Sequence, residues 1–332
     1  MNRLSLVQFR GDDMSRAVAA VIDSEPPRRL RGAASVYELA MLAAGSGMGM
    51  TGAVASSQPG EVVDLEAVIR EKRLMPPIDH PDPAHLYATG TGLTHHGSAE
   101  SRDAMHRETM EPAAQTDSMR MFQMGIQGGK PPQGEIGAQP EWFYKGNGKC
   151  IVGSGEPLIS PAFAQDAGEE PEIAGVYLID RDGAPLRLGF CLANEFSDHI
   201  TEKKNYLWLA HSKLRPLALG PELLTGALPE NVEGTVRIRR SGSVLWEKPF
   251  RSGEGNMSHS IANLEYHHFK YDVFRQPGDV HVHVFGTSTL SFNDGIRTEP
   301  GDTFEIKASP FRWPLRNELR QAKTMEFRIG AL

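Results

Sequence analysis

The hydrophobic and polar positions at the start of the chain indicate two short strands followed by a helix. Apolar residues dominate 4–10 and 17–22, and we expect a strand at each. Residues 35–44 read SVYELAMLAA, in which Ser35 can cap a helix and Glu38, three positions later, has the spacing of a capping box. The chain is therefore expected to begin with mixed α/β structure.

The pattern from 62 to 139 is interrupted by proline and glycine. A helix is expected at 62–72, and four prolines between 76 and 83 end any element there. Residues 88–96, ATGTGLTHH, are interpreted as a Gly/Thr-rich turn, and 98–120 as a helix. The Gly/Pro/Gln-rich segment 125–139 predicts a fifteen-residue loop, a length more typical of a lid or binding loop than of a spacer.

Beyond residue 140 the pattern is that of a β-rich protein. Asp182-Gly183 is a hairpin turn signal between two of the expected strands. Two helix-like stretches, 221–225 and 258–274, interrupt the series. The expected strands are 141–145, 173–179, 187–193, 234–239, 243–246, 280–285 and 303–306.

The order of these elements predicts an α+β fold that is mainly β. It does not alternate as a doubly wound protein does. A chain of 332 residues has room for two domains. We expect a smaller mixed α/β N-terminal domain at 1–110, which contributes a lid segment, and a β-rich catalytic domain at 111–332.

Composition excludes several classes of protein. With 35 Lys and Arg against 42 Asp and Glu, the net charge of −7 argues against nucleic acid and anionic membranes as partners. Cys150 and Cys191 are too few for a disulfide scaffold. Neither a signal peptide at the start nor an apolar run of about 18–20 residues is evident, so we expect a cytoplasmic protein.

Carboxylates are the candidate chemistry. Glu170 and Glu172, in GEEPEIAGVYLID, lie two positions apart and share a face of an extended chain. A hairpin through Asp182-Gly183 brings Glu195 to the same end. Three carboxylates suit Mg²⁺, Mn²⁺ or Ca²⁺ rather than zinc. An acidic turn before a strand is the alternative interpretation of Glu170 and Glu172.

The chain resembles the fumarylacetoacetate hydrolase superfamily through an ordered series of short motifs. The series covers about 140–317, more than half the chain. No single motif is specific for this superfamily, whereas the ordered series as a whole is a strong indication of it. The motifs are Phe143-Tyr144-Lys145, Glu170-Pro171-Glu172, Asn194-Glu195-Phe196-Ser197, Ser212-Lys213, Gly220-Pro221, Gly278-Asp279, Gly286-Thr287, Pro300-Gly301-Asp302 and Leu315-Arg316-Asn317.

The resemblance implies a mixed β-sandwich roll and a Mg²⁺ or Mn²⁺ site. It implies that Glu170, Glu172 and Glu195 bind the metal, although most of the family has Asp at the third position. It also implies a homodimer. A dication would depress the pKa of a neighbouring lysine, so a catalytic base is expected there. The implied catalytic residues are Lys213, Thr287 and His95, which we prefer to the adjacent His96. The expected substrate contacts are Tyr144, Lys145, Arg215 and Gly286.

Segments along nearly the whole chain also resemble a bacterial branch of 2-keto-3-deoxy-L-arabonate (pentonate) dehydratases. Examples are PDPAHLYATGTGLTHHGSAESRDAMH and MSHSIANLEYHHFKY. The substrate this implies is a small 2-keto acid. Lys213 would remove a C3 proton to give a metal-stabilised enolate, and loss of the C4 hydroxyl, assisted by Thr287, would lead to 2-oxoglutarate semialdehyde.

Two alternatives remain open. One is hydrolysis of a C–C bond in a 2,4-diketo (acylpyruvate-type) acid, with water activated by His95 and Glu100 or Asp103. The other is a non-catalytic protein that binds sugar acids.

Overall fold

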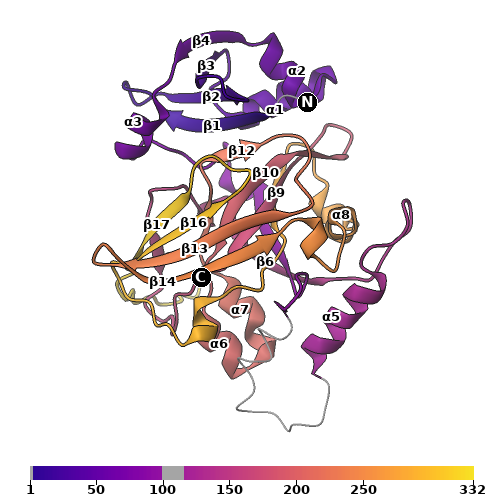
Figure 1. Ribbon diagram of the computed structural model, residues 1–332, viewed down its shortest axis with the longest axis vertical. Coiled ribbons are helices and arrows are strands. Elements are labelled where there is room, and N and C mark those ends of the chain that lie inside the picture. The colour runs from indigo at the N-terminus through magenta and orange to yellow at the C-terminus, as the bar shows by residue number, and fades with distance from the viewer. Residues whose placement is uncertain (1–2, 99–115) are drawn as a thin grey trace.

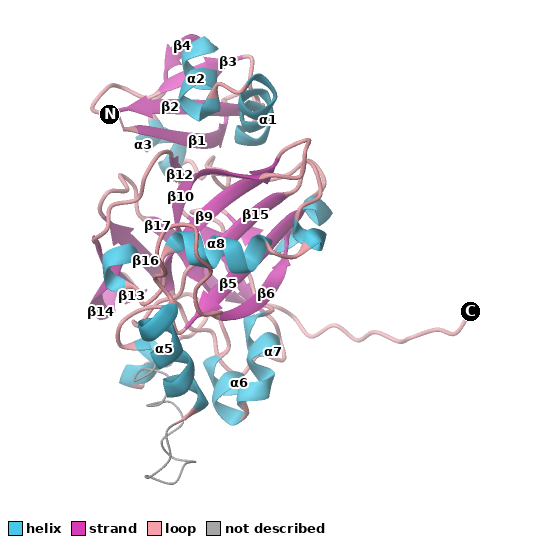
Figure 2. Cartoon of the chain, turned by 90° about the vertical axis from the view of Figure 1, so that its right-hand side faces the viewer, coloured by secondary structure: helices cyan, strands magenta, loops and turns pink. Residues whose placement is uncertain are grey.

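The computed structural model describes residues 3–98 and 116–332, which form two sheets and a set of short helices (Figures 1 and 2). The strands are β1 Leu4–Arg10, β2 Arg16–Ile22, β3 Arg28–Arg31, β4 Gln58–Val62, β5 Leu86–Gly92, β6 Glu141–Asn147, β7 Ile151–Val152, β8 Leu158–Ser160, β9 Pro171–Ile179, β10 Pro185–Glu195, β11 Leu217–Leu219, β12 Glu222–Leu224, β13 Val232–Arg240, β14 Ser243–Ser252, β15 Val280–Val284, β16 Thr303–Ala308 and β17 Leu315–Gln321. The α-helices are α1 Val36–Ser46, α2 Gly49–Ser56, α3 Leu65–Arg70, α5 Asp117–Gly128, α6 His199–Lys204, α7 Leu209–Lys213 and α8 Ile261–Phe269.

The larger sheet has the order β4-β3-β2-β1-β12-β10-β9-β15-β5-β6, with β11 and β7 attached beside β10. The second sheet has the order β14-β13-β16-β17-β8. One apolar core lies between the sheets and includes Phe190, Ile173 and Ile306. Every residue of β9 is buried, which explains its continuous apolar sequence, because water reaches neither face of a central strand.

The N-terminal strands belong to the larger sheet. β1 pairs with β12 in antiparallel register, and β12 in turn contacts β10. A second apolar core joins helices α1 and α2 to residues of the body such as Ala174 and Leu217. Figure 1 shows this part above the body, with α5, α6 and α7 at the opposite end.

Most of the expected strands are confirmed within a few residues. The hairpin of β9 and β10 forms as expected, and it pairs Ala193 with Glu172. Helix α1 begins after Ser35, whose side chain accepts a hydrogen bond from the Glu38 backbone N–H. The expected helix at 98–120 lies largely outside the described residues, and α5 begins only at Asp117.

Three expectations are wrong. The 88–96 turn is mostly strand β5, which lies between β15 and β6, and the helix-like 221–225 contains β12. The loop at 125–139 starts with the end of α5. The rest of that segment is tied to α8, since Gly137 donates to the Asn263 side chain, which in turn donates to the Ala138 carbonyl. No residue of 125–139 lines the pocket of the candidate site.

No single described helix is long and apolar enough to cross a membrane. Helices α1 and α2 reach the required length and hydropathy only as a pair, and they are bent by 107°.

Candidate active site

Three carboxylates meet where β9 begins and β10 ends. Glu170 precedes β9, Glu172 lies on it, and Glu195 closes β10. Each offers a carboxylate oxygen within 4.8 Å of the others, and all three residues are buried. The pairing of the hairpin explains this, since the Glu195 backbone N–H donates to the Glu170 carbonyl at 3.0 Å. Within 3–98 and 116–332 this is the one group of three such residues with metal-binding geometry.

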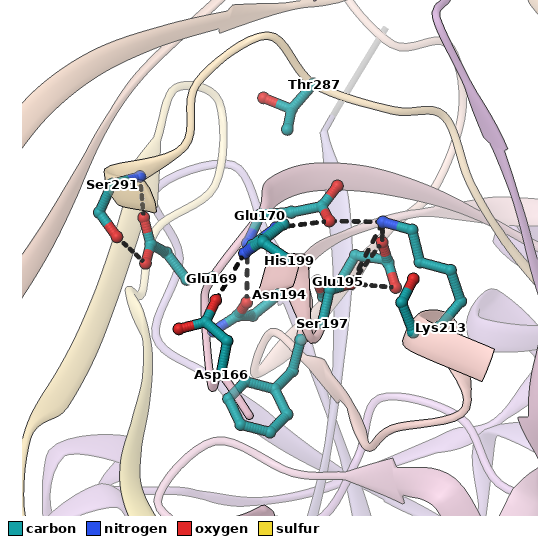
Figure 3. A network of polar contacts seen from close by, with 12 residues as sticks. Asp166, Glu169, Glu170, Asn194, Glu195, Ser197, His199, Lys213, Thr287 and Ser291 are labelled. Atoms are coloured by element: carbon teal, nitrogen blue, oxygen red, sulfur yellow. Dashed lines mark hydrogen bonds and ion pairs between the residues drawn. The ribbon is translucent and has the colours of Figure 1, made fainter. Parts of the chain in front are cut away.

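Two buried lysines neutralise part of this charge. Lys213, at the end of α7, donates to Glu170 and Glu195 at 2.5 Å each (Figure 3). Its Nζ also lies 5.2 Å from the centre of the Phe143 ring. Lys145, on β6, donates to the other Glu195 oxygen and, at 2.7 Å, to the Phe196 carbonyl. The lysines thus hold two of the three carboxylates from opposite sides.

Glu172 has no such cation in contact. Its Oε2 accepts the Gly286 backbone N–H at 2.6 Å. Burial and the neighbouring charges of Glu170 and Glu195 raise the pKa of Glu172 well above its usual range. For Glu170 burial acts in the same direction, but Lys213 and His199 outweigh it and lower the pKa of Glu170 well below that range. Glu172 is therefore the glutamate of the triad that no lysine contacts.

The donor set fits a hard divalent cation. Oxygen ligands at a buried triad match what Mg²⁺ and Mn²⁺ prefer, and no thiol is present to favour a softer metal. The expected depression of the Lys213 pKa presupposes such a cation. With the carboxylates alone the reverse holds, because Glu170 and Glu195 overcome the effect of burial and raise the pKa of Lys213 well above its usual range.

A pocket opens over these groups. Thr287 and Gly286 lie on its wall together with Lys213 and Phe143. Gly286 adopts φ +92°, and a Cβ there would lie 2.5 Å from Thr94 Oγ1, so only glycine fits. The full lining is Thr91, Gly92, Leu93, Ser98, Phe143, Glu170, Glu172, His199, Glu202, Lys213, Gly286, Thr287 and Leu290.

His95 is not brought to this pocket. It is 1% exposed, with Nε2 3.0 Å from Ser252 Oγ and Nδ1 3.1 Å from Thr94 Oγ1. Burial lowers the pKa of His95 to about 3, so the ring is neutral. His96 is exposed and also lies off the pocket wall. Glu100 and Asp103, considered as partners of His95, lie outside the described residues.

The expected substrate contacts divide into two groups. Gly286 lines the pocket, and Lys145 lies behind it against Glu195. Tyr144 points to the opposite face of β6, because burial alternates along that strand. Arg215 is buried off the pocket wall and pairs with Asp198 at 3.0 Å.

Sequence reasoning missed a histidine at the site. His199, in the first turn of α6, donates to Glu170 at 3.1 Å and to Asp166 at 3.2 Å. Burial opposes its charge, but these two carboxylates prevail and raise the pKa of His199 to about 10. The segment NEFSDH places this histidine four residues after Glu195, but its contacts with Glu170 and Asp166 depend on where α6 packs.

Comparison with known proteins identifies the fold. Neither a family model nor a curated protein matches the chain. The chain does match solved structures, and two of these are of 2-keto-3-deoxy-arabinonate dehydratase. One has a TM-score of 0.71 at 18% identity, covering 96% of this chain and 100% of that chain. The second, a complex with magnesium and 2,5-dioxopentanoate, has a TM-score of 0.70 at 18% identity, covering 98% and 100%.

A further match is the 5-carboxymethyl-2-hydroxymuconate delta-isomerase from Mycobacterium smegmatis. Its TM-score is 0.58 at 18% identity, covering 96% of this chain and 100% of that chain. The chain therefore has the fold that these dehydratase and isomerase structures share, and the predicted α+β, mainly β fold class is confirmed.

Proposed function

We propose that this protein is a divalent-cation-dependent dehydratase of a 2-keto-3-deoxy sugar acid, with 2-keto-3-deoxy-L-arabonate or a related pentonate as substrate. The observation that carries the proposal is the buried Glu170, Glu172 and Glu195 triad with Lys213 on the wall of the same pocket. The expected product is 2-oxoglutarate semialdehyde, also called 2,5-dioxopentanoate, which is the compound in the complex of one structure with this fold.

The three glutamates would hold Mg²⁺, with Mn²⁺ as a substitute. The cation supplies Lewis-acid polarisation of the 2-keto group when bound. Lys213 removes a proton from C3, since its Nζ lies at the edge of the triad. Thr287, elsewhere on the wall, binds the C4 hydroxyl, which departs as water with the proton that Lys213 has taken from C3. Lys145 neutralises Glu195 from behind and keeps its carboxylate in place.

For assembly and location we keep the expectations drawn from the sequence. We infer a cytoplasmic homodimer that acts on a small 2-keto acid and binds neither nucleic acid nor membrane. Size-exclusion chromatography with light scattering tests the dimer.

Product analysis tests the proposal. Purified protein with Mg²⁺ receives 2-keto-3-deoxy-pentonates and, in parallel, a 2,4-diketo-3-deoxypentonate. Glu170→Ala is the inactive control, and Glu25→Gln, on the exposed surface, is the matched neutral control. We expect semialdehyde from the wild type and from Glu25→Gln, and none from Glu170→Ala.

Two results would overturn the proposal that the protein is a dehydratase. Pyruvate from the diketo acid alone would make the protein a C–C hydrolase. Since His199 lines the pocket and His95 does not, His199 would then be the histidine to test for a role in hydrolysis. Saturable binding of a sugar acid without turnover in the presence of Mg²⁺ would make it a binding protein.

A further inference from the structure

The substrate-facing segment that follows β15 is anchored at both ends by glutamates of one short run. At its start, the Gly286 N–H donates to Glu172 at 2.6 Å. At its end, Ser291 donates twice to Glu169, through its backbone N–H at 2.9 Å and its hydroxyl at 2.7 Å. Figure 3 shows Glu169 and Ser291 paired beside the site, with Thr287 above it.

Glu169 is not itself part of the pocket. It is 0% exposed and absent from the pocket wall, whereas Thr287 and Leu290, between the two anchors, both line it. A buried carboxyl is costly unless its oxygens are hydrogen-bonded, and the two bonds from Ser291 meet that need. Both carboxylate oxygens of Glu169 are thus engaged by Ser291.

The end of the segment also rests on α6. Phe292 follows Ser291, and its ring centre lies 5.3 Å from that of His199. Leu290 and Phe292 pack with Ile200 in a small apolar cluster. The cluster of Leu290, Phe292 and Ile200 is apolar and permits sliding, so directional bonds fix the register of the segment. These are the two bonds from Ser291 to Glu169 and a longer one, 3.4 Å, from Thr289 Oγ1 to the Pro249 carbonyl.

We propose that Glu169 is a positioning residue: by holding Ser291 it fixes segment 286–291 and keeps Thr287 in its place on the pocket wall. The inference rests on the proposed function for its kinetic consequence, but the anchoring itself does not. Misplacing a substrate-binding group by about 1 Å costs up to about 100-fold in rate, so loss of this anchor is expected to lower turnover without removing the cation site.

The experiment compares six variants of the chain. They are Glu169→Gln, Ser291→Ala, Ser291→Thr, Thr287→Ala, the double variant Glu169→Gln/Thr287→Ala and Glu25→Gln. Glu169→Gln keeps the shape but replaces one acceptor oxygen with a donor. Ser291→Ala removes only the hydroxyl bond, and Ser291→Thr restores a hydroxyl at that position. Glu25→Gln is the control for an exposed glutamate.

Three readouts are taken with Mn²⁺ as the probe. Amide hydrogen exchange is measured over 286–292, Mn²⁺ affinity by calorimetry, and kcat and KM on the 2-keto-3-deoxy-pentonate that the wild type turns over. We expect faster exchange in Glu169→Gln and Ser291→Ala, a Mn²⁺ Kd within about twofold of wild type, and kcat lowered by about 10- to 100-fold in Glu169→Gln. Ser291→Thr is expected to recover part of the loss seen in Ser291→Ala.

The double variant decides whether Glu169 acts through Thr287. We expect it to lose no more activity than Thr287→Ala alone, since a residue that acts through another adds nothing once that other is gone. Losses that multiply, wild-type exchange in Glu169→Gln, or loss of Mn²⁺ binding in parallel with activity would each overturn the inference. If the wild type turns over no keto acid, the proposed function fails, while hydrogen exchange still decides the anchoring.

Discussion

At the scale of single residues, the site is organised by unequal sharing of two lysines among three glutamates. Glu195 contacts both Lys145 and Lys213, Glu170 contacts Lys213, and Glu172 contacts neither. Glu172, the carboxyl without a lysine, has a pKa raised well above its usual range. Burial and the charge of Glu170 also raise the pKa of Glu195, although both lysines oppose this rise. A cation that binds the triad therefore competes with a proton at Glu172 up to a higher pH than at an ordinary carboxyl.

This predicts how metal affinity changes with pH. Below the raised pKa of Glu172 the carboxyl is protonated and competes with the cation. As pH rises through that pKa, the competition ends and binding tightens. Calorimetric titration with Mn²⁺ from pH 5.5 to 8 is expected to show a falling Kd and proton release into the buffer. A Kd independent of pH would contradict this assignment, and Glu172→Gln is expected to lose the proton release.

Lys213 is expected to matter both for turnover and for the charge of the site. Replacing it by Met keeps most of the length of the side chain but leaves Glu170 and Glu195 without their shared cation. Loss of a positioned proton-transfer group costs about 10²–10⁴-fold in rate. The variant is therefore expected to lose turnover in that range, and added Mn²⁺ is expected to raise its melting temperature more than that of the wild type. A melting shift equal to that of the wild type would contradict the charge argument.

The triad could be predicted from the sequence because a hairpin has a fixed register, whereas Lys213, which lies outside the hairpin on α7, was expected only through the family resemblance. The turn at Asp182-Gly183 and the period of two along β9 and β10 are local features. The contacts of His199 and Glu169 could not be predicted in this way. They depend on where α6 and the segment after β15 pack, and those positions are set by pairings remote in the chain.

At the scale of elements, β5 shows why a glycine-rich segment can be a central strand. Its sequence LYATGTG has few large side chains, so the pattern resembles a turn. The structure supplies the reason, since Phe143 from β6 and Val284 from β15 close over Gly90. β12 is misread for a related reason: its three residues carry too little periodicity to separate strand from helix.

Gly90→Ala is expected to destabilise the protein. A Cβ at this position would lie 2.4 Å from Phe143 Cζ and 2.5 Å from Val284 Cγ2. Overpacking of this kind costs about 1–3 kcal/mol of unfolding free energy. Gly45→Ala is the matched control, because nothing lies within 4 Å of the position that its added methyl group would occupy and alanine favours the α1 helix. Urea unfolding that ranks the two variants equally would show that β5 accommodates the added methyl group.

At the scale of the whole molecule, the division expected near residue 110 does not coincide with a break in the sheet. β5, from before that position, pairs with β15 and β6 inside the body. β1 extends the same sheet through β12, and Arg312 of the body donates to the Asp23 carbonyl. Local patterns could not predict this, because each of these contacts joins segments far apart in the sequence.

The shared sheet and core predict that the chain unfolds as one unit. Removing the N-terminal strands would expose the core that α1 and α2 share with the body, so neither part is expected to keep its structure once the other unfolds. Differential scanning calorimetry is therefore expected to show one endotherm, which Mn²⁺ moves as a whole to higher temperature, because a ligand of the native state stabilises every part that unfolds with its site. Two endotherms, of which Mn²⁺ moves only one, would instead show that the N-terminal part is an independent domain despite its place in the sheet.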